Sequence, residues 1–175
     1  MSDKKLLLEV DALKVHFKIK SDKSWPWSPA LNLKAVDGVS IKLYEGETLG
    51  VVGESGCGKT TVGKAALRLV EATAGEFLLD GENITALPEQ ALHPLRRAVQ
   101  MVFQDAISAA NPRKTVREML REPMRHLLSL TKSEQLARAS AMLKAVDLDD
   151  SVLDKRPPQL SGGQLQRVLL ARAIV

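Results

Sequence analysis

The feature that most constrains the fold of this chain is a glycine-rich segment at positions 53–60, which reads Gly-Glu-Ser-Gly-Cys-Gly-Lys-Thr. It follows the short apolar run Leu49–Val52 and precedes an expected helix over Lys59–Val70, so it joins a buried strand to a helix. Glycines allow the backbone to curl so that successive N–H groups point at one anion. The helix N-terminus adds unpaired N–H groups and a partial positive charge. The segment therefore predicts a phosphate-binding loop.

The residues of this loop have separate expected roles. We expect Lys59 to reach the terminal phosphates and act in catalysis, the Thr60 hydroxyl to bind Mg²⁺, and Thr61 to contact a further phosphate. Cys57 occupies a position where the pattern accepts any residue, and we interpret it as structural and not as a nucleophile. The predicted phosphate-binding residues are Gly53, Glu54, Ser55, Gly56, Cys57, Gly58, Lys59, Thr60 and Thr61.

Apolar runs, either alternating with polar residues or continuous, predict strands before and after this loop. Ser21–Ala30 contains Pro26 and Pro29 and is predicted to be a loop, whereas Glu45-Gly46 and Asp80-Gly81 are predicted turns. The predicted strands cover residues 13–19, 39–43, 49–52, 77–79 and 99–103.

The later part of the chain has a helical pattern, with helices expected over Thr115–Leu130 and Thr131–Leu148. Thr131 and Glu134 have the spacing of a capping box, which marks the start of the second helix. Pro123 is expected to break or kink the first helix, because it lacks an N–H and its ring clashes with the preceding turn. Strands followed by helices suggest a nucleotide-binding core with a helical lobe attached.

A second distinctive helix start lies near the end of the sequence, where Leu-Ser-Gly-Gly-Gln precedes an expected helix over 165–175. Ser161 and Gln164 have capping-box spacing, so Ser161 is the predicted N-cap. An ordinary helix cap is one interpretation, but Gly162 and Gly163 cost about 1 kcal/mol each in helix propensity. Bare glycines allow another molecule to approach the first turn, so this turn also predicts contact with an anion.

The segment Leu160–Gln164 resembles the signature motif of the ATP-binding cassette (ABC) ATPases, which reads LSGGQ in that family. Leu165-Gln166-Arg167 is similar to the usual continuation of the motif. In that family two cassettes pair head to tail, and the signature of one closes on the ATP held by the phosphate loop of the other. The resemblance implies that the following residues contact a neighbour's nucleotide: Ser161, Gly162, Gly163 and Gln164.

The resemblance extends over nearly the whole chain and implies an α/β fold. The implied architecture is a P-loop NTPase (RecA-like) core with an N-terminal antiparallel β subdomain and a helical signature subdomain, incomplete at the C-terminus. It implies one partial nucleotide-binding domain over 1–175, with the β subdomain and core over about 1–105 and the helical subdomain over about 106–175.

Two further sites are implied by the same resemblance. Val102-Phe103-Gln104-Asp105 resembles the family's Q-loop, in which Gln104 would be catalytic, would touch Mg²⁺ or the attacking water, and would link the core to the helical lobe. Phe17 falls where the family has an aromatic residue that stacks on adenine, although it fits the apolar face of its strand equally well. Trp25 and Trp27 are alternatives for stacking, but a surface-loop position suits them better.

The segment around Gln104 also resembles one subgroup, the peptide and nickel importers. The similarity includes Asn111-Pro112-Arg113 and the phosphate loop. The sequence departs from the subgroup at Ala106, where relatives usually carry proline, and at Ile107–Ala110. The resemblance implies the ATP-binding subunit of an importer, with peptides as the first expected cargo, ATP and Mg²⁺ as cofactors, and transport coupled to ATP hydrolysis.

The family's next motifs, an apolar strand ending in Asp-Glu (Walker B) and a later switch histidine, do not occur in this sequence. His16, His93 and His126 lie before the signature and cannot replace the histidine by position. We therefore expect the 175-residue chain alone to bind nucleotide weakly and to hydrolyse none.

The composition is that of an ordinary globular protein. The net charge of +4 is scattered, which indicates a solvated surface and no nucleic-acid partner. The single cysteine, Cys57, fits a reducing cytoplasm, and no apolar stretch approaches the roughly 20 residues that span a bilayer. The resemblance to the ABC importers implies a location at the cytoplasmic face of the inner (plasma) membrane. It also implies transmembrane permease subunits and a second ABC subunit, identical or different, as partners.

Two other functions remain open at this stage. One is a soluble ABC ATPase that acts on ribosomes or DNA, although the interval between Gln104 and Ser161 is too short for the long coiled coil of the DNA-repair type. The other is an inactive fragment, because without the Walker B strand the edges of neighbouring strands would be exposed.

Overall fold

The computed structural model describes residues 4–19 and 31–174, which divide into two compact units, Met1–Leu92 and His93–Val175. The predicted loop over Ser21–Ala30, with Trp25 and Trp27, lies outside the described residues. The domain boundary expected near residue 105 falls inside the second of these units.

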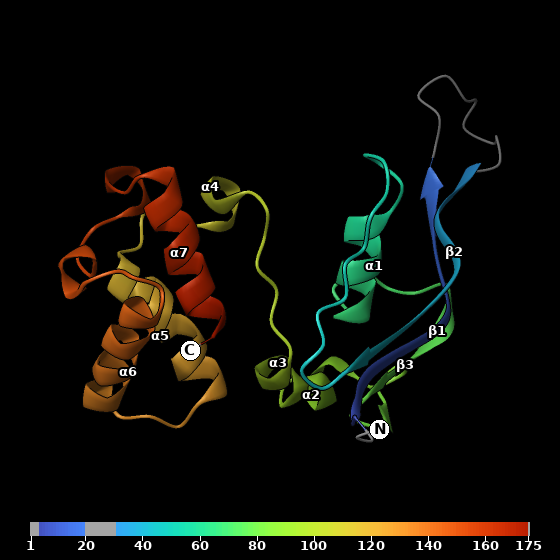
Figure 1. Cartoon of the computed structure of the whole chain (residues 1–175), viewed down its shortest axis with the longest axis horizontal. Coiled ribbons are helices and arrows are strands. Elements are labelled where there is room, and N and C mark those ends of the chain that lie inside the picture. Colours follow the sequence, from blue (N-terminus) through green and yellow to red (C-terminus); the bar gives the residue numbers. More distant parts are fainter. Residues whose placement is uncertain (1–3, 20–30, 175) are drawn as a thin grey trace. The chain divides into compact units, whose positions relative to one another are not determined.

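The first unit is built on a four-stranded antiparallel sheet with the strand order β2-β1-β3-β4 (Figure 1). This sheet agrees with the expected N-terminal antiparallel part, although the first two strands are longer than the apolar patterns indicated. The strands are β1 (Leu6–Ile19), β2 (Leu31–Tyr44), β3 (Ala74–Leu79) and β4 (Glu82–Asn83).

The core of this unit lies between the sheet and one helix. Val10 of β1 pairs with Phe77 of β3, and both side chains are almost completely buried. The register of β1 shifts around Ala12, which has a positive φ of 46°. Gly75 of β3 crosses this irregular part of β1 closely, because a Cβ at Gly75 would lie 2.6 Å from the Cα of Leu13. A side chain at position 75 would push the two strands apart.

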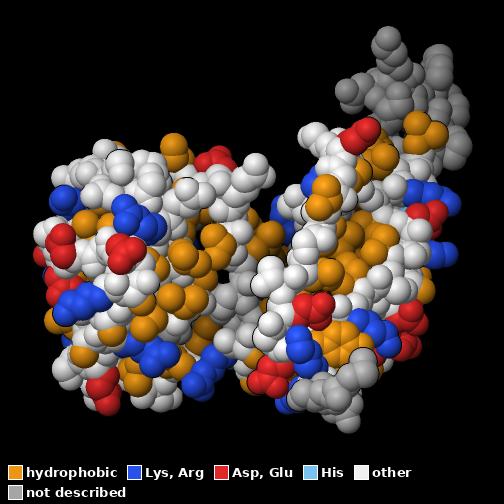
Figure 2. All heavy atoms as spheres, viewed as in Figure 1, with side chains coloured by type: hydrophobic (Ala, Val, Ile, Leu, Met, Phe, Trp, Pro, Cys, Tyr) orange, Lys and Arg blue, Asp and Glu red, His pale blue; other side chains and the backbone are white. Residues whose placement is uncertain are grey.

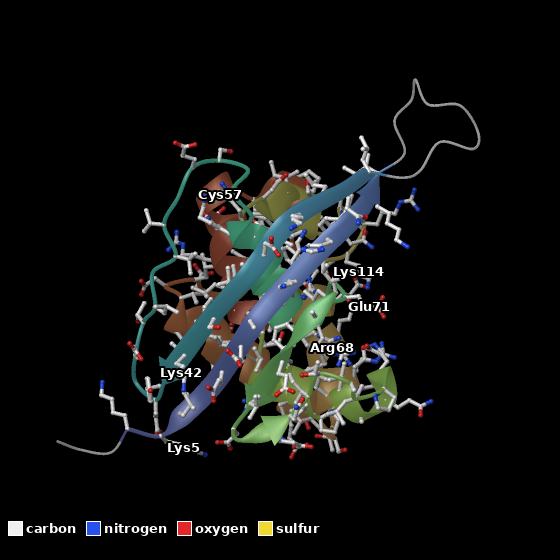
Figure 3. All side chains as sticks on the ribbon, turned by 90° about the vertical axis from the view of Figure 1, so that its right-hand side faces the viewer. Lys5, Lys42, Cys57, Arg68, Glu71 and Lys114 are labelled. Atoms are coloured by element: carbon white, nitrogen blue, oxygen red, sulfur yellow. The ribbon has the colours of Figure 1, made fainter. Side chains whose placement is uncertain are left out.

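Helix α1 (Lys59–Ala66) lies along one face of the sheet and buries Val62 and Ala65 (Figure 1). It ends four residues earlier than the expected Val70, because Arg68 has a φ of 54°, which no right-handed helix accommodates. The short helix α2 (Glu89–Leu92) closes the unit. Salt bridges join Lys5 to Asp80 and Lys42 to Glu9 (Figure 3), but both are exposed and contribute little to stability.

Two predicted strands, Leu49–Val52 and Val99–Phe103, are wrong for this structure. Neither belongs to the sheet among the described residues, and both expose apolar side chains: Val52 is 95% exposed and Phe103 is 44% exposed. Figure 2 shows hydrophobic side chains on the visible surface of each unit. A central strand needs neighbours on both sides to satisfy its N–H and C=O groups, and these two segments have none within the described residues.

The second unit is helical and packs three longer helices, α5, α6 and α7, around one core (Figure 1). Both predicted helices form, and the first continues past Pro123 instead of ending there. The largest fully buried side chains of this core include Met119, Leu120, Met124 and Leu143. The helices are α3 (Leu95–Ala98), α4 (Ala106–Ala109), α5 (Val116–Leu127), α6 (Lys132–Ala145) and α7 (Gly162–Ala173), with 3-10 turns η1 (Asp150–Val152) and η2 (Pro157–Gln159).

The boundary between the units is displaced from position 105 because the predicted strand at 99–103 does not form. A hollow in the second unit is lined by residues 100–103 together with Leu169 and Arg172 of α7 and Pro123 of α5. The segment therefore packs with the helices and not with the sheet.

Candidate functional site

Two glycines of the phosphate loop have backbone conformations that would strain any other residue. Gly56 and Gly58 have positive φ values of 85° and 96°. A Cβ on Gly58 would overlap the backbone carbonyl of Ala35 in β2, and a Cβ on Gly53 would lie 2.8 Å from the Cys57 sulfur. The loop is thus held against its own turn and against β2.

The ammonium group of Lys59 lies inside this loop. Its Nζ donates to the carbonyl oxygens of Gly53 at 2.8 Å and Glu54 at 2.6 Å, and lies 3.6 Å from the Cys57 Sγ. The loop therefore places one positive charge at its centre, among the residues that the sequence pattern singled out for phosphate binding.

The first turn of α1 offers backbone donors for an anion. The first bond of the helix joins the Val62 N–H to the Gly58 carbonyl at 2.9 Å, and the N-cap Gly58 has no side chain to cap the turn. Among the described residues, the N–H groups of Lys59, Thr60 and Thr61 have no hydrogen-bond acceptor, and the hydroxyls of the two threonines have no partner. Unpaired donors at a helix N-terminus beside a lysine form a site for a phosphate group.

Cys57 is an exposed free thiol on the loop. Figure 3 labels it beside the start of α1. A Cβ on Gly53 would lie 2.8 Å from its sulfur, and the structural role expected for Cys57 stays a prediction.

The signature segment begins α7 in the way its spacing predicts. The Ser161 hydroxyl accepts from the Gln164 N–H at 3.2 Å, and the Gln164 side chain accepts from the Ser161 N–H at 3.0 Å. A Cβ on Gly162 or Gly163 would meet no atom within 4 Å, so packing within the chain does not require glycine at either position. The two glycines leave the first turn of α7 bare and open to another molecule.

The segment that leads into the signature is fixed to α5. Arg117 forms a two-pronged ion pair with Asp154, with Nη2 2.9 Å from Oδ1 and 3.0 Å from Oδ2. The N–H groups of Val116 and Arg117 also donate to the carbonyls of Lys155 and Leu153. These bonds satisfy the start of α5 and hold the chain a few residues before Ser161.

The remaining predicted site residues lie apart from the phosphate loop in the sequence and are exposed. Gln104 is in the second unit, in a segment without regular structure, and none of the described residues pairs with its side chain. Phe17 is on β1 opposite Leu33 and is 40% exposed, so its ring is not enclosed by the core of the sheet. The phosphate loop and Phe17 belong to the first unit, and Gln104 and the signature to the second.

Asp105 caps the start of α4, a role that the sequence patterns did not predict. Its carboxylate caps α4 by accepting from the N–H groups of Ile107 and Ser108, and from the Ser108 hydroxyl at 2.5 Å. These hydrogen bonds, the Ser108 hydroxyl first, lower the pKa of the Asp105 carboxyl. The sequence feature that could have predicted this cap is the spacing of Asp105 and Ser108, because aspartate is a favoured N-cap residue.

The residues of the loop fit a nucleoside triphosphate with its magnesium ion. The unpaired amides and Lys59 match phosphate oxygens, and the free Thr60 hydroxyl suits Mg²⁺, which needs few protein ligands when phosphates and water complete its shell. No cluster of three or more metal-ligating side chains occurs among the described residues.

A family model described as "ABC transporter" matches residues 36–175, which include both the phosphate loop and the signature. This chain belongs to the ABC transporter family. Proteins of this ABC family are ATP-binding domains with ATPase activity, and the α/β fold class expected from the sequence is confirmed.

Among curated relatives, the nickel import ATP-binding protein NikE of Escherichia coli (strain K12) is 63% identical over 139 residues. NikE of Shigella boydii serotype 4 (strain Sb227) has the same identity, and the match covers 79% of this ABC chain and 52% of the relative. The chain therefore spans about half the length of the curated relatives it matches.

Solved structures of ABC cassettes resemble the whole chain. The ATP-binding cassette MJ0796, in a dimeric post-hydrolysis structure bound to ADP and Pi, has a TM-score of 0.81 and 27% identity, and the match covers 96% of this chain and 69% of that one. The cbiO1 protein of Clostridium perfringens, part of the cbiONQ complex, has a TM-score of 0.74 at 22% identity over 98% of this chain and 62% of its own, which supports the fold alone.

Proposed function

We propose that this chain is the nucleotide-binding part of the ATP-binding subunit of an ABC importer. The observation that carries the proposal is the pair of bare helix starts: the first turn of α1 beside Lys59, and the first turn of α7 at Ser161. Each offers unpaired backbone donors where family members contact ATP.

Within the first unit, the chain's own residues would bind and orient the triphosphate. The amide N–H groups of Lys59, Thr60 and Thr61 would donate hydrogen bonds to phosphate oxygens. The Lys59 ammonium would exchange its bonds to the loop carbonyls for bonds to the terminal phosphates. The Thr60 hydroxyl would hold Mg²⁺, and the half-exposed ring of Phe17 would stack on the base. Bound ATP with Mg²⁺ supplies the phosphoanhydride bond whose hydrolysis drives transport.

The second unit would serve the nucleotide of a second cassette. Gly162 and Gly163 keep the first turn of α7 open, and the Ser161–Gln164 capping box fixes its direction. A partner cassette, identical or different, would therefore be needed for a complete ATP site. The dimeric MJ0796 structure supports this arrangement by similarity.

Substitution of Lys59 tests the nucleotide site directly. In calorimetric titrations of the 175-residue chain with Mg-ATP, Lys59→Ala should weaken affinity by about 10- to 100-fold, since a hydrogen bond to a charged group contributes about 1.5–3 kcal/mol. Lys64→Ala, on the last turn of the same helix, is the matched control and should bind like the unaltered chain. Equal affinity for the Lys59 and Lys64 variants, or no uptake by the unaltered chain, would reject the site.

For the cargo, we propose nickel in preference to peptide. The sequence patterns did not separate these two importers, whereas relatives at 63% identity are named for nickel import. No helix in the described parts of the chain is long and apolar enough to cross a membrane. By similarity to the nickel import ATP-binding proteins, we propose a peripheral position on the cytoplasmic face of the membrane, held there by permease subunits.

A binding competition tests the cargo and the location together. The tagged chain, with Mg-ATP, would be presented to permease subunits of a nickel importer, permease subunits of a peptide importer, and ribosomes. Retention on the nickel permease is the expected result. Preference for the peptide permease would reverse the cargo assignment, and preference for ribosomes would favour the soluble, non-transport alternative.

A further inference from the structure

Arg68, just after α1, has a backbone conformation that is unusual for an arginine. Its N–H donates to the Ala65 carbonyl at 2.8 Å, and the Leu69 N–H reaches back to the Lys64 carbonyl at 2.8 Å. This is the Schellman arrangement, and Arg68 occupies the left-handed position, with a φ of 54°, where glycine is the usual residue. A strained residue persists where the surrounding structure holds it, so the side chain must provide something that glycine cannot.

The Arg68 guanidinium provides three hydrogen bonds to one short segment. Nη1 donates to the carbonyls of Ile84 and Thr85, both at 2.5 Å, and Nη2 donates to the carbonyl of Leu87 at 3.3 Å. Figure 3 shows Arg68 beside β3. The planar fork of an arginine can join several carbonyls at once, which a single ammonium on a lysine does less well.

The segment that accepts the Arg68 hydrogen bonds, residues 84–87, is itself hydrogen-bonded to β3. The Ile84 N–H donates to the Phe77 carbonyl at 2.8 Å, and the Phe77 N–H donates to the Thr85 hydroxyl at 2.7 Å. Phe77 is completely buried in β3. Arg68 therefore connects the end of α1 to a rigid part of the sheet.

The other end of α1 is held in a different way. Gly58 packs directly on the Ala35 carbonyl of β2, and Val62 and Ala65 are buried against the sheet. Contact at Gly58 limits how closely the helix approaches β2. The hydrogen bonds of Arg68 add a directional restraint at the other end of the helix.

We propose that Arg68 is a positioning residue for the phosphate loop: by anchoring the end of α1, it sets where the amides of Lys59, Thr60 and Thr61 lie relative to a bound phosphate chain. The inference rests on the proposed nucleotide site. Arg68 acts through the helix and touches no phosphate itself, since it lies beyond the opposite end of an eight-residue helix.

Two variants separate positioning from mere stability. Arg68→Gly removes the side chain and also removes the backbone strain, so the helix end keeps its preferred residue. Arg68→Lys keeps the positive charge and loses the fork. Inorganic tripolyphosphate and Mg-ATP are titrated into each 175-residue variant by calorimetry, at a temperature where its unfolding curve shows it fully folded, with Lys59→Ala alongside.

Arg68→Gly should weaken binding of both ligands by about tenfold or more, because losing one hydrogen bond to a charged group lowers affinity by about that factor. Arg68→Lys should fall between this variant and the unaltered chain, and the amide NMR signals of Lys59, Thr60 and Thr61 should shift in both. If Arg68→Gly does not fold, Arg68→Lys decides alone: reduced affinity supports the inference and unchanged affinity overturns it.

The proposed function and this inference fail in different ways. Normal binding by both Arg68 variants, with loss in Lys59→Ala, overturns the positioning role and leaves the nucleotide site intact. No binding by the unaltered chain, or normal binding by Lys59→Ala, overturns both.

Discussion

Gly58 shows how a single residue can be fixed by its backbone and by its surroundings at once. It has a φ of 96°, and a side chain there would meet the Ala35 carbonyl. Gly63 lies further along the same helix, where an added Cβ would meet nothing within 4 Å. The same substitution should therefore have opposite effects at two positions that are five residues apart.

Gly58→Ala should lower the free energy of unfolding by at least about 1–2 kcal/mol, the strain of a left-handed alanine, before the steric overlap is counted. Gly63→Ala should raise it by about 0.5–1 kcal/mol, because alanine favours the helix. Urea unfolding followed by circular dichroism measures both. A Gly58→Ala variant as stable as the unaltered chain would mean that the loop does not have this conformation.

For single residues, the sequence predicted best those features that depend on neighbouring positions in the chain. The loop residues and the Ser161 cap were predicted because short motifs encode them in consecutive positions. Arg68 and Ala35 were not predicted, because their importance arises from contacts with residues distant in the sequence, Ile84 and Gly58. No periodicity or motif marks such tertiary contacts.

Among the elements, α7 combines a favourable cap with two unfavourable residues. The Ser161 hydroxyl caps the helix, whereas Gly162 and Gly163 weaken its first turn. The helix would be more stable without the glycines, which suggests that they serve contact with another molecule.

Gly163→Ala should raise the free energy of unfolding by up to about 1 kcal/mol and Ser161→Ala should lower it by about 1 kcal/mol. We expect both variants to reduce the ATP-dependent association of two cassettes, as measured by light scattering, because both alter the first turn of α7. If association changed only in step with stability, the glycines would have no separate role.

Helix starts were easier to predict than strands. The Thr131–Glu134 box begins α6 at Lys132, as the spacing indicated. The apolar segments 49–52 and 99–103 were predicted as strands from their composition, but a strand forms only when other strands pair with it. Apolar character establishes that such a segment prefers burial, and it does not provide the hydrogen-bonding neighbours.

Across the whole molecule, the acid side of the stability profile should be set by carboxylates whose pKa is lowered. Each accepts hydrogen bonds from a neighbour, such as the Lys34 and His16 side chains at Asp37 or the Thr131 hydroxyl at Glu134. The carboxyl groups with a lowered pKa are Asp37, Asp105, Glu118, Glu122, Glu134 and Asp149.

A carboxyl whose pKa is lower in the folded state binds protons more readily when unfolded. Its stabilising effect is complete above the unfolded pKa of about 4 and is lost as the pH falls through the folded pKa. The unfolding temperature should therefore decrease as the pH falls below about 4.5. Glu134→Gln keeps the capping acceptor without the titration, so its curve should be shallower; an identical curve would contradict the assignment.

The general plan of the molecule was predictable, and its division was not. An antiparallel sheet followed by helices was expected from the order of the patterns and is found. The boundary at Leu92 depends on which elements residues 93–105 pack against, and that choice is a property of the tertiary structure.

The two internal bonds of Lys59 affect how the loop would accept a ligand. Since its ammonium already has carbonyl acceptors at 2.8 and 2.6 Å, an incoming anion must displace bonds as well as form them. The net enthalpy of capture is then smaller than the number of new contacts suggests. The ammonium also screens the carbonyl oxygens of Gly53 and Glu54, which would otherwise repel an anionic ligand.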